Sequence, residues 1–208
     1  MKKFNMIPMI ATTFFLLTAG CSLHGGISIP VDTASSAPGT MVSVKGETHQ
    51  LVGTPLQVGS PLPATALIDA FTMKKVDISQ MKGKVLLLSV VPSIDTKVCE
   101  AQTHLLAEKV ARLPQEVVRI AISRDTPFAQ KRFAEEAKLT GLTFLSDYKE
   151  GAFGRATGLL IDDSMLLARS VVVVDKDGIV RYIQVVPELS HLPDMETAFG
   201  KAVALSGK

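Results

Sequence analysis

Residues 85–100 read VLLLSVVPSIDTKVCE and join an apolar run to a cysteine. The run from Val85 to Val91 holds one polar side chain, Ser89, and this pattern is typical of a strand buried on both faces of a sheet. Pro92 ends that strand, and a helix-forming segment begins a few residues later. The stretch therefore predicts a strand, a loop and a helix, with Cys99 in the first turn of the helix.

The segments around this unit alternate between strand and helix patterns. A hairpin is expected over 41–52, around Lys45-Gly46-Glu47, because apolar and polar residues alternate on both sides of that turn. Further strands are expected at 66–71, 117–122, 143–145, 169–174 and 179–186, with a short strand or a turn at 74–79. Helices are expected at 96–113, 128–139, 151–157 and 193–205. This order predicts an α/β protein with a thioredoxin-like fold, in which helices flank a mixed central sheet that follows an N-terminal β-hairpin.

Two helices carry more specific signals. Val98, Ala101 and Leu105 fall at helical spacing, so this face of the helix at 96–113 is expected to pack on the core. Asp125-Thr126-Pro127 precedes the next helix, where an N-cap residue and an early proline belong.

Composition and charge exclude some classes of function. The chain has 208 residues, which is enough for one domain with targeting and linker segments left over. It has 22 basic and 20 acidic residues, and Lys2 and Lys3 account for the difference. A neutral body without a basic patch argues against nucleic-acid binding. The four histidines are dispersed and no cysteine cluster exists, so we expect neither a metal site nor a cofactor.

The N-terminus has the features of a targeting signal. A basic start, an apolar run densest over 10–17 and three small residues precede Cys21. The string LTAGC at 17–21 resembles the lipobox of bacterial lipoproteins, which implies a signal peptide over 1–20 and a lipid anchor on Cys21. Ser22, by the same resemblance, implies an extracytoplasmic protein on the periplasmic side of the outer membrane. An ordinary signal peptide or a tight N-terminal anchor is the alternative.

Residues 22–40 are rich in small and polar residues and lack hydrophobic periodicity. This composition predicts that 21–40 is a flexible tether carrying the lipidated cysteine. A tether of about nineteen residues spans on the order of 25 Å. The folded domain is expected over 41–208.

Cys99 is a candidate nucleophile. The thiolate is the reactive form of cysteine, and the N-terminal turn of a helix stabilises an anion through its unpaired N–H groups. Thr96 lies three residues earlier, where its hydroxyl can bridge Cys99 and an incoming oxygen. The residue spacing alone leaves a buried structural cysteine as an equal alternative.

The pattern Pro92-x-x-x-Thr96-x-x-Cys99 matches the peroxidatic motif of the peroxiredoxins. The longer string VPSIDTKVCEAQT at 91–103 is similar to the thiol peroxidase subfamily, as are the segments at 122–133 and 168–178. The resemblance covers roughly residues 42–205. It implies that Cys99 attacks hydrogen peroxide or an organic hydroperoxide and becomes a sulfenic acid. It implies that Thr96 forms a hydrogen bond with the peroxide. It also implies that Arg169 holds the thiolate and stabilises charge as the O–O bond breaks. A surface ion pair is the alternative role for Arg169.

One position departs from this subfamily. Most thiol peroxidases carry a resolving cysteine after the string Lys-Arg-Phe, where this chain has Ala134. With Cys21 acylated, no second thiol remains. We therefore expect a one-cysteine cycle in which an external thiol, either a small molecule or a thioredoxin-like protein, reduces the sulfenic acid. Relatives dimerise beside the active site, which implies a homodimer.

Two other readings compete with a membrane-tethered peroxidase. One is a catalytically reduced lipoprotein that uses Cys99 to sense oxidants or to bind a partner. The other is a thiol–disulfide exchange protein, but that chemistry needs a Cys-x-x-Cys motif, which the neighbours of Cys99 do not provide. The intact motif residues favour the peroxidase.

Overall fold

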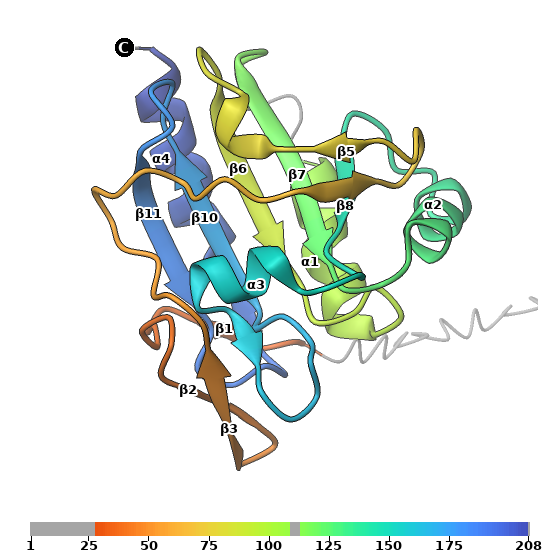
Figure 1. The fold of residues 1–208 in the computed structure, drawn as a ribbon, viewed down its shortest axis with the longest axis vertical. Helices are drawn as coiled ribbons and strands as arrows, with labels where there is room; N and C mark the ends of the chain where they lie inside the picture. Colours follow the sequence, from red (N-terminus) through yellow and green to blue (C-terminus); the bar gives the residue numbers. More distant parts are fainter. Residues whose placement is uncertain (1–27, 109–112, 208) are drawn as a thin grey trace, which may run out of the picture.

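The structure is a computed structural model that describes residues 28–108 and 113–207. Within these residues, seven strands form a mixed sheet in the order β11-β10-β6-β7-β8-β4-β5 (Figure 1). They are β4 (Leu67–Asp69), β5 (Lys75–Val76), β6 (Val85–Val90), β7 (Val117–Ser123), β8 (Thr143–Ser146), β10 (Ser170–Val174) and β11 (Val180–Val185). β6, β7 and β8 are parallel, and the outer strands are antiparallel to their neighbours.

Helices lie on both faces of the sheet (Figure 1). In the described part of the chain they are α1 (Lys97–Glu108), α2 (Pro127–Glu136), α3 (Ala152–Thr157), α4 (Met195–Ser206) and the 3-10 helix η1 (Ile78–Gln80). Side chains of α1, α2 and α4 share one hydrophobic cluster, and those of α3 belong to the cluster on the other face. The predicted thioredoxin-like α/β fold is confirmed.

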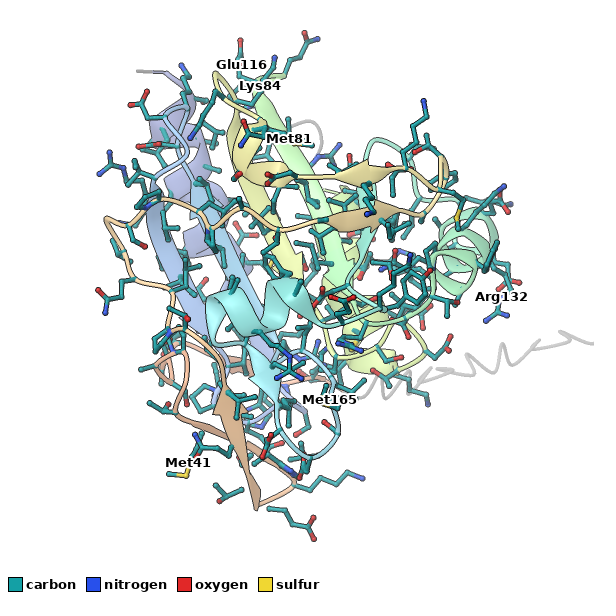
Figure 2. All side chains as sticks on the ribbon, viewed as in Figure 1. Met41, Met81, Lys84, Glu116, Arg132 and Met165 are labelled. Carbon is teal, nitrogen blue, oxygen red and sulfur yellow. The ribbon has the colours of Figure 1, made fainter. Side chains whose placement is uncertain are left out.

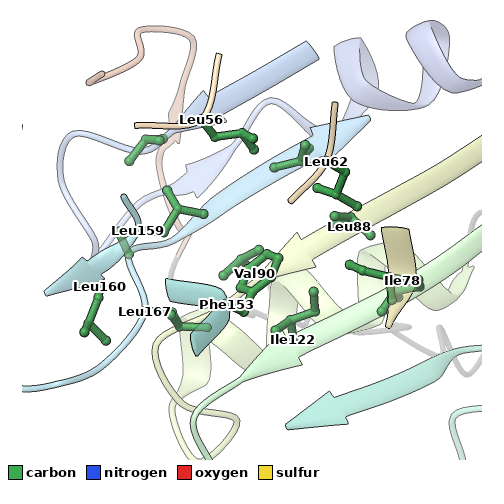
Figure 3. Packing of buried hydrophobic residues seen from close by; sticks show 14 of the residues in the cluster. Leu56, Leu62, Ile78, Leu88, Val90, Ile122, Phe153, Leu159, Leu160 and Leu167 are labelled. Atoms are coloured by element: carbon green, nitrogen blue, oxygen red, sulfur yellow. The ribbon is translucent and has the colours of Figure 1, made fainter. Parts of the chain in front are cut away.

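The central strand β6 is buried on both faces, as its sequence predicts. Successive side chains of a strand point to opposite faces of the sheet, so its residues divide between two cores. Leu86 and Leu88 pack with the cluster that includes Phe153 of α3 (Figure 3). Val85 and Leu87 pack on the opposite face with α1, α2 and α4.

The beginning of α2 is as predicted, whereas the buried face of α1 is not. Thr126 is the N-cap of α2, its side chain accepts a hydrogen bond from the backbone N–H of Ala129, and Pro127 opens the helix. On α1 the three apolar residues expected to face the core are only partly buried. The residues buried instead are Cys99, Gln102, Thr103 and Leu106. This face can be buried because its polar side chains find hydrogen-bond partners in the interior. A search for apolar residues at helical spacing does not detect such a face.

Two smaller sheets adjoin the main one. The predicted hairpin is present as β2 (Met41–Val44) and β3 (Glu47–Val52), which pair antiparallel around the expected turn. β3 also pairs with β9 (Leu160–Ile161), a short strand that the sequence did not indicate.

The expectation of a flexible tether over 21–40 is wrong from Pro30 onward, since Pro30 O accepts a hydrogen bond from the Leu192 N–H and the Gly39 N–H donates to Gly158 O, each at 2.8 Å. Val31–Asp32 forms β1, which pairs parallel with β12 (Leu192–Pro193). The Ser36 N–H donates to Val185 O at 2.9 Å. The side chain of Gln184 donates to the backbone oxygens of Asp32 and Ala34. Hydrogen bonds to the backbone, rather than an apolar face, hold this segment, which is why hydrophobic periodicity did not reveal it.

The predicted signal peptide, the lipidation site Cys21 and the start of the tether lie outside the described residues, as does most of the last turn expected for α1. No helix in the described ranges has both the length and the apolarity needed to span a bilayer.

Candidate active site

The candidate site lies at the carboxyl ends of the parallel strands β6 and β7, at the end of the sheet away from Lys84 and Glu116 (Figure 2). Parallel neighbours bring the loops that follow them to the same edge of a sheet. Asp125, after β7, accepts hydrogen bonds from Ser93 Oγ and from the backbone N–H of Ile94, each at 2.8 Å. The loop that precedes α1 is therefore anchored to the neighbouring strand–helix unit.

Cys99 lies in the first turn of α1 and its side chain is fully buried. It is the one cysteine in the described part of the chain, and it is a free thiol. Its cluster contains Val91 and Ile94, with Ala129 and Phe133 of α2 packed against it. An apolar setting of this kind disfavours a charged sulfur unless nearby groups compensate.

Two side chains provide that compensation. The hydroxyl of Thr96 donates to Cys99 Sγ at 2.9 Å, and Nη2 of Arg169 donates to the same atom at 3.3 Å. A guanidinium in contact with the sulfur stabilises its negative charge electrostatically, and the short hydroxyl contact adds a second donor. Thr96 and Arg169, which the resemblance to the peroxiredoxins implied as partners of Cys99, thus both contact its sulfur. Pro92 lies in the wall of the adjoining pocket.

Arg169 is held from three sides. It directly precedes β10, and its side chain is 2% exposed. Nε donates to the backbone oxygen of Leu189 at 2.9 Å, and Nη1 donates to Gln102 Oε1 at 2.9 Å. Because these bonds fix the plane of the guanidinium, Nη2 points at the sulfur. The alternative role in a surface ion pair is wrong for Arg169, since the group is buried.

Gln102 is a site residue that sequence reasoning missed. Its side chain is fully buried, and Nε2 donates to Ser89 Oγ on β6 at 2.8 Å while Oε1 accepts from Arg169. A glutamine three residues after Cys99 shares its helix face, and that spacing is the signal that was available. Gln102 therefore connects the central strand to the arginine.

A pocket of about 540 Å³ opens beside these residues. Its lining comes from four segments: Val44, Lys45, Glu47 and His49 of the hairpin; Pro92, Thr96 and Val98; Ile161, Ser164 and Leu166; and Arg169, Leu189 and Ser190. Most of the exposed lining is apolar, with charged groups supplied by the hairpin and by Arg169. A molecule that enters the pocket meets the two side chains that donate to Cys99.

His49 of β3 also lines the pocket. Its Nδ1 lies 2.7 Å from Asp163 Oδ2, and this hydrogen bond lowers the pKa of the Asp163 carboxyl. The pair lies where the hairpin meets the loop after β9.

Neither a metal site nor a second thiol accompanies Cys99 in the described ranges. No group of three or more His, Cys, Asp or Glu side chains is arranged there to hold a metal ion. The position expected for a resolving cysteine, Ala134, is buried in the cluster beneath α2 with Phe144.

Comparisons with known proteins show what the sequence and the fold are similar to. Residues 57–199 match the Redoxin family. Over 163 residues the chain is 40% identical to the thiol peroxidase of Halalkalibacterium halodurans, an alignment covering 78% of this chain and 97% of that protein. It is also 40% identical over 165 residues to the thiol peroxidase of Streptococcus pneumoniae, covering 79% and 100% of the two chains.

Solved structures of peroxiredoxin-like proteins have a fold similar to that of this chain. A peroxiredoxin-like protein from Aquifex aeolicus superimposes with a TM-score of 0.75 at 32% identity, covering 83% of this chain and 99% of the other. The thiol peroxidase from Chromobacterium violaceum superimposes with a TM-score of 0.66 at 18% identity, covering 76% and 92%. The second likeness concerns the fold alone.

Proposed function

Because the chain belongs to the Redoxin family and is a peroxiredoxin of the thiol peroxidase type, we propose that it reduces hydroperoxides through Cys99 alone and that an external thiol completes each cycle. The observation that carries the proposal is the pair of contacts on the sulfur, from Thr96 at 2.9 Å and Arg169 at 3.3 Å. A buried thiol with two polar donors, one of them a cation, differs from an inert core cysteine.

The reaction begins when the Cys99 thiolate attacks one oxygen of the peroxide. An S–O bond forms, the O–O bond breaks, and the departing oxygen takes a proton to leave as water or an alcohol, so that Cys99 becomes a sulfenic acid. In our proposal Thr96 hydrogen-bonds the peroxide, and Arg169 stabilises the negative charge that moves from sulfur to the leaving oxygen. Pro92 shields this loop from the side of the pocket.

The pocket supports organic hydroperoxides as substrates beside hydrogen peroxide. Its lining includes the apolar side chains of Val44, Val98, Ile161 and Leu166, which suit an alkyl or aryl group. A peroxide group at the Thr96 and Arg169 end leaves room for such a group toward the hairpin.

The second half of the cycle needs thiols from outside the chain. One external thiol condenses with the sulfenic acid to form a mixed disulfide and water, and a second thiol then releases the Cys99 thiol and an external disulfide. Ala134, at the position of the subfamily's resolving cysteine, supports this route.

The decisive experiment is the rate of Cys99 oxidation by hydrogen peroxide and by cumene hydroperoxide, followed as trapped sulfenic acid on the Cys99 peptide by mass spectrometry. We expect rate constants far above that of free cysteine. The Cys99→Ser variant, which has no thiol at this position, serves as the blank. A rate equal to that of free cysteine would leave only a sensor or binding role. Sustained peroxide consumption with a small dithiol separates an enzyme from a sensor that reacts once.

The one-cysteine cycle has its own test. The oxidised protein should gain one oxygen atom at Cys99, and mass spectrometry of the intact chain should show no loss of two hydrogens. An internal disulfide between Cys99 and Cys21 would contradict the proposal. The Ala134→Cys variant tests whether the missing thiol is the reason, since we expect it to lose two hydrogens on oxidation.

We further propose that the protein is an extracytoplasmic lipoprotein anchored through Cys21, on the periplasmic side of the outer membrane. The lipobox-like string at 17–21 supports this. Because Pro30 O accepts a hydrogen bond from the Leu192 N–H and the chain from Val31 on pairs with the body, a spacer can extend no further than residue 29. A flexible segment of about eight residues, 22–29, would span roughly 14–17 Å. The domain would lie closer to the headgroups than a tether reaching residue 40 would allow.

Mass spectrometry of the N-terminal peptide from the protein's own host tests the anchor. We expect a chain that begins at acylated Cys21, and we expect Cys21→Ser to leave the membrane fraction. An unmodified Cys21, or cleavage at another residue, would disprove it.

A further inference from the structure

The loop 186–191, between β11 and β12, carries a carboxylate that the peroxidase motif does not include. Glu188 lies in this loop, directly before Leu189, whose backbone oxygen accepts the hydrogen bond from Arg169 Nε at 2.9 Å. The backbone N–H of Val186 also donates to Arg169 O at 2.9 Å. The loop therefore contacts both the side chain and the backbone of Arg169.

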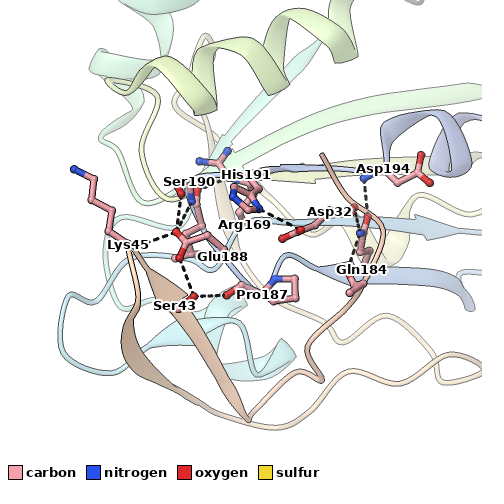
Figure 4. Close-up of polar contacts among 12 residues, drawn as sticks. Asp32, Ser43, Lys45, Arg169, Gln184, Pro187, Glu188, Ser190, His191 and Asp194 are labelled. Carbon is pink, nitrogen blue, oxygen red and sulfur yellow. Dashed lines mark hydrogen bonds and ion pairs between the residues drawn. The ribbon is translucent and has the colours of Figure 1, made fainter. Parts of the chain in front are cut away.

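Glu188 accepts hydrogen bonds from two segments that are far apart in the sequence (Figure 4). From the hairpin, Ser43 Oγ donates at 2.9 Å, and the backbone N–H groups of Lys45 and Gly46 donate at 3.0 and 3.3 Å. From its own loop, Ser190 donates through its backbone N–H at 3.1 Å and through Oγ at 2.7 Å. One carboxylate thus joins the tip of the hairpin to the loop that holds the arginine.

These donors require the ionised carboxylate. Burial by itself raises the pKa of Glu188, but the hydrogen bonds from Ser190, Lys45 and Ser43 outweigh it and lower the pKa from 4.5 to about 2. The group is therefore ionised at neutral pH. A glutamine at position 188 would direct an amide N–H, itself a donor, toward the N–H and O–H groups that now donate to the carboxylate.

The same loop and hairpin form part of the pocket. Lys45, Leu189 and Ser190 line it together with Arg169. A shift between hairpin and loop would change the width of the pocket and the position of the Leu189 oxygen at once.

We propose that Glu188 is a positioning residue for peroxide reduction, which acts through the Leu189 carbonyl on Arg169 and sets the hairpin wall of the pocket. The proposal rests on the function assigned to Cys99 above. Glu188 itself does not touch the sulfur, and its effect is to hold a donor in place for the transition state.

Asp175 provides a matched control at the other end of the same pair of strands. It is a buried carboxylate in the turn between β10 and β11, and it accepts hydrogen bonds from the backbone N–H groups of Asp177 and Ile179 and from Arg181. Burial raises its pKa and these bonds outweigh that effect, so the pKa of Asp175 is also lowered. It does not line the pocket.

The test compares Glu188→Gln with Asp175→Asn in the full-length chain. Both variants should melt at lower temperature than the parent. We expect the rate constant for Cys99 oxidation by hydrogen peroxide to fall about tenfold in Glu188→Gln and to stay unchanged in Asp175→Asn. We also expect a larger loss for cumene hydroperoxide than for hydrogen peroxide in the first variant, because the hairpin wall moves. Equal rates in the two folded variants would overturn the proposal.

A double-mutant cycle separates positioning from a general structural effect. If Glu188 acts through Arg169, the tenfold loss should shrink to less than about twofold when Arg169 is already glutamine. An unchanged tenfold loss in that background contradicts the proposal. Should Glu188→Gln fail to fold, Ser43→Ala removes one donor and should lower the rate about two- to threefold, and an unaltered rate there counts equally against it. A parent protein no faster than free cysteine would instead refute the peroxidase assignment.

Discussion

The two strand–helix units β6–α1 and β7–α2 lie side by side and are built alike, yet in the described part of the chain only the first carries a cysteine, whose sulfur accepts hydrogen bonds from two side chains. In each unit a serine near the end of the strand accepts a hydrogen bond from a glutamine of the following helix. Gln102 Nε2 donates to Ser89 Oγ, and Gln130 Nε2 donates to Ser123 Oγ, each at 2.8 Å. These serines and glutamines are buried.

A threonine directly precedes each helix, but its hydroxyl makes a different hydrogen bond in the two units. Thr126 caps α2 by accepting a hydrogen bond from the backbone N–H of Ala129 at 3.3 Å. Thr96 instead donates its hydroxyl to Cys99 Sγ. The residue three positions after the threonine is Ala129 in one unit and Cys99 in the other.

The larger difference comes from a third segment. Oε1 of Gln102 accepts from Arg169, whereas Oε1 of Gln130 has no hydrogen-bond partner within the described part of the chain. A cysteine at the start of a helix is thus only part of the site. The arginine delivered by β10 makes the difference between the two units.

Replacement of the arginine should therefore have the largest effect. We expect Arg169→Gln to lower the rate of Cys99 oxidation by about 10²–10³-fold, because it removes the cation that stabilises the developing charge. Arg119 of β7 is the matched control, since it is also buried but donates to the backbone oxygens of Leu106, Ala107 and Gly141. Arg119→Gln should lower the melting temperature and leave the rate of the folded protein unchanged. A similar rate loss in both would mean that Arg169 acts through the fold alone.

The two threonines give the next largest contrast. Thr96→Val should slow Cys99 oxidation about tenfold to a hundredfold, because it removes a hydrogen bond to a charged atom. Thr126→Val should instead cost about 1 kcal/mol of unfolding free energy through the lost cap, without a change in rate. Stopped-flow oxidation and urea unfolding measure the two quantities. If the two variants exchanged these effects, the assigned roles would be wrong.

The glutamines offer a finer comparison. Gln102→Leu frees one N–H of Arg169, and we expect about a tenfold slower oxidation of Cys99. Gln130→Leu should leave the rate unaltered, since within residues 28–108 and 113–207 the hydrogen bonds of its amide go to Ser123 Oγ and the backbone oxygen of Leu145. The test is the rate of Cys99 oxidation by hydrogen peroxide, measured for both variants at equal concentrations of folded protein. A slower rate in Gln130→Leu would contradict the roles assigned to the two glutamines.

The last contrast concerns stability in acid, on which the oxidation rate does not depend, and it distinguishes the loop 186–191 from the rest of the protein. The pKa of Glu188 falls from 4.5 to about 2 on folding, so ionisation contributes stability that is complete above about pH 4.5 and is lost as pH falls toward about 2. Urea unfolding of the parent should therefore show a steeper decline over this range than Glu188→Gln. The difference between the two curves isolates this carboxylate from the other acids, and parallel curves would contradict the shift.

Much of the fold was predictable because it depends on local patterns. The apolar run from Val85 to Val91, the turn at Lys45-Gly46-Glu47 and the cap at Thr126 each act within a few residues. Residue spacing also indicated Cys99 and Thr96, and the resemblance to the peroxiredoxins indicated Arg169. Contacts between distant segments escaped prediction. Gln102 is polar and buried, so it was not assigned to the inner face of α1, and the pairing of Val31–Asp32 with β12 depends on backbone hydrogen bonds that composition does not reveal.

By itself, the sequence determined a buried strand, a loop and a helix with Cys99 in its first turn, because burial and helix capping are properties of neighbouring residues. Only the tertiary structure decided which groups meet the sulfur and how they are held. Arg169 approaches from a strand 70 positions further along the chain, and the Leu189 carbonyl and Glu188 follow from the packing of a loop against a hairpin. Such contacts depend on the register of the sheet and on the satisfaction of buried polar groups, which are properties of the whole fold.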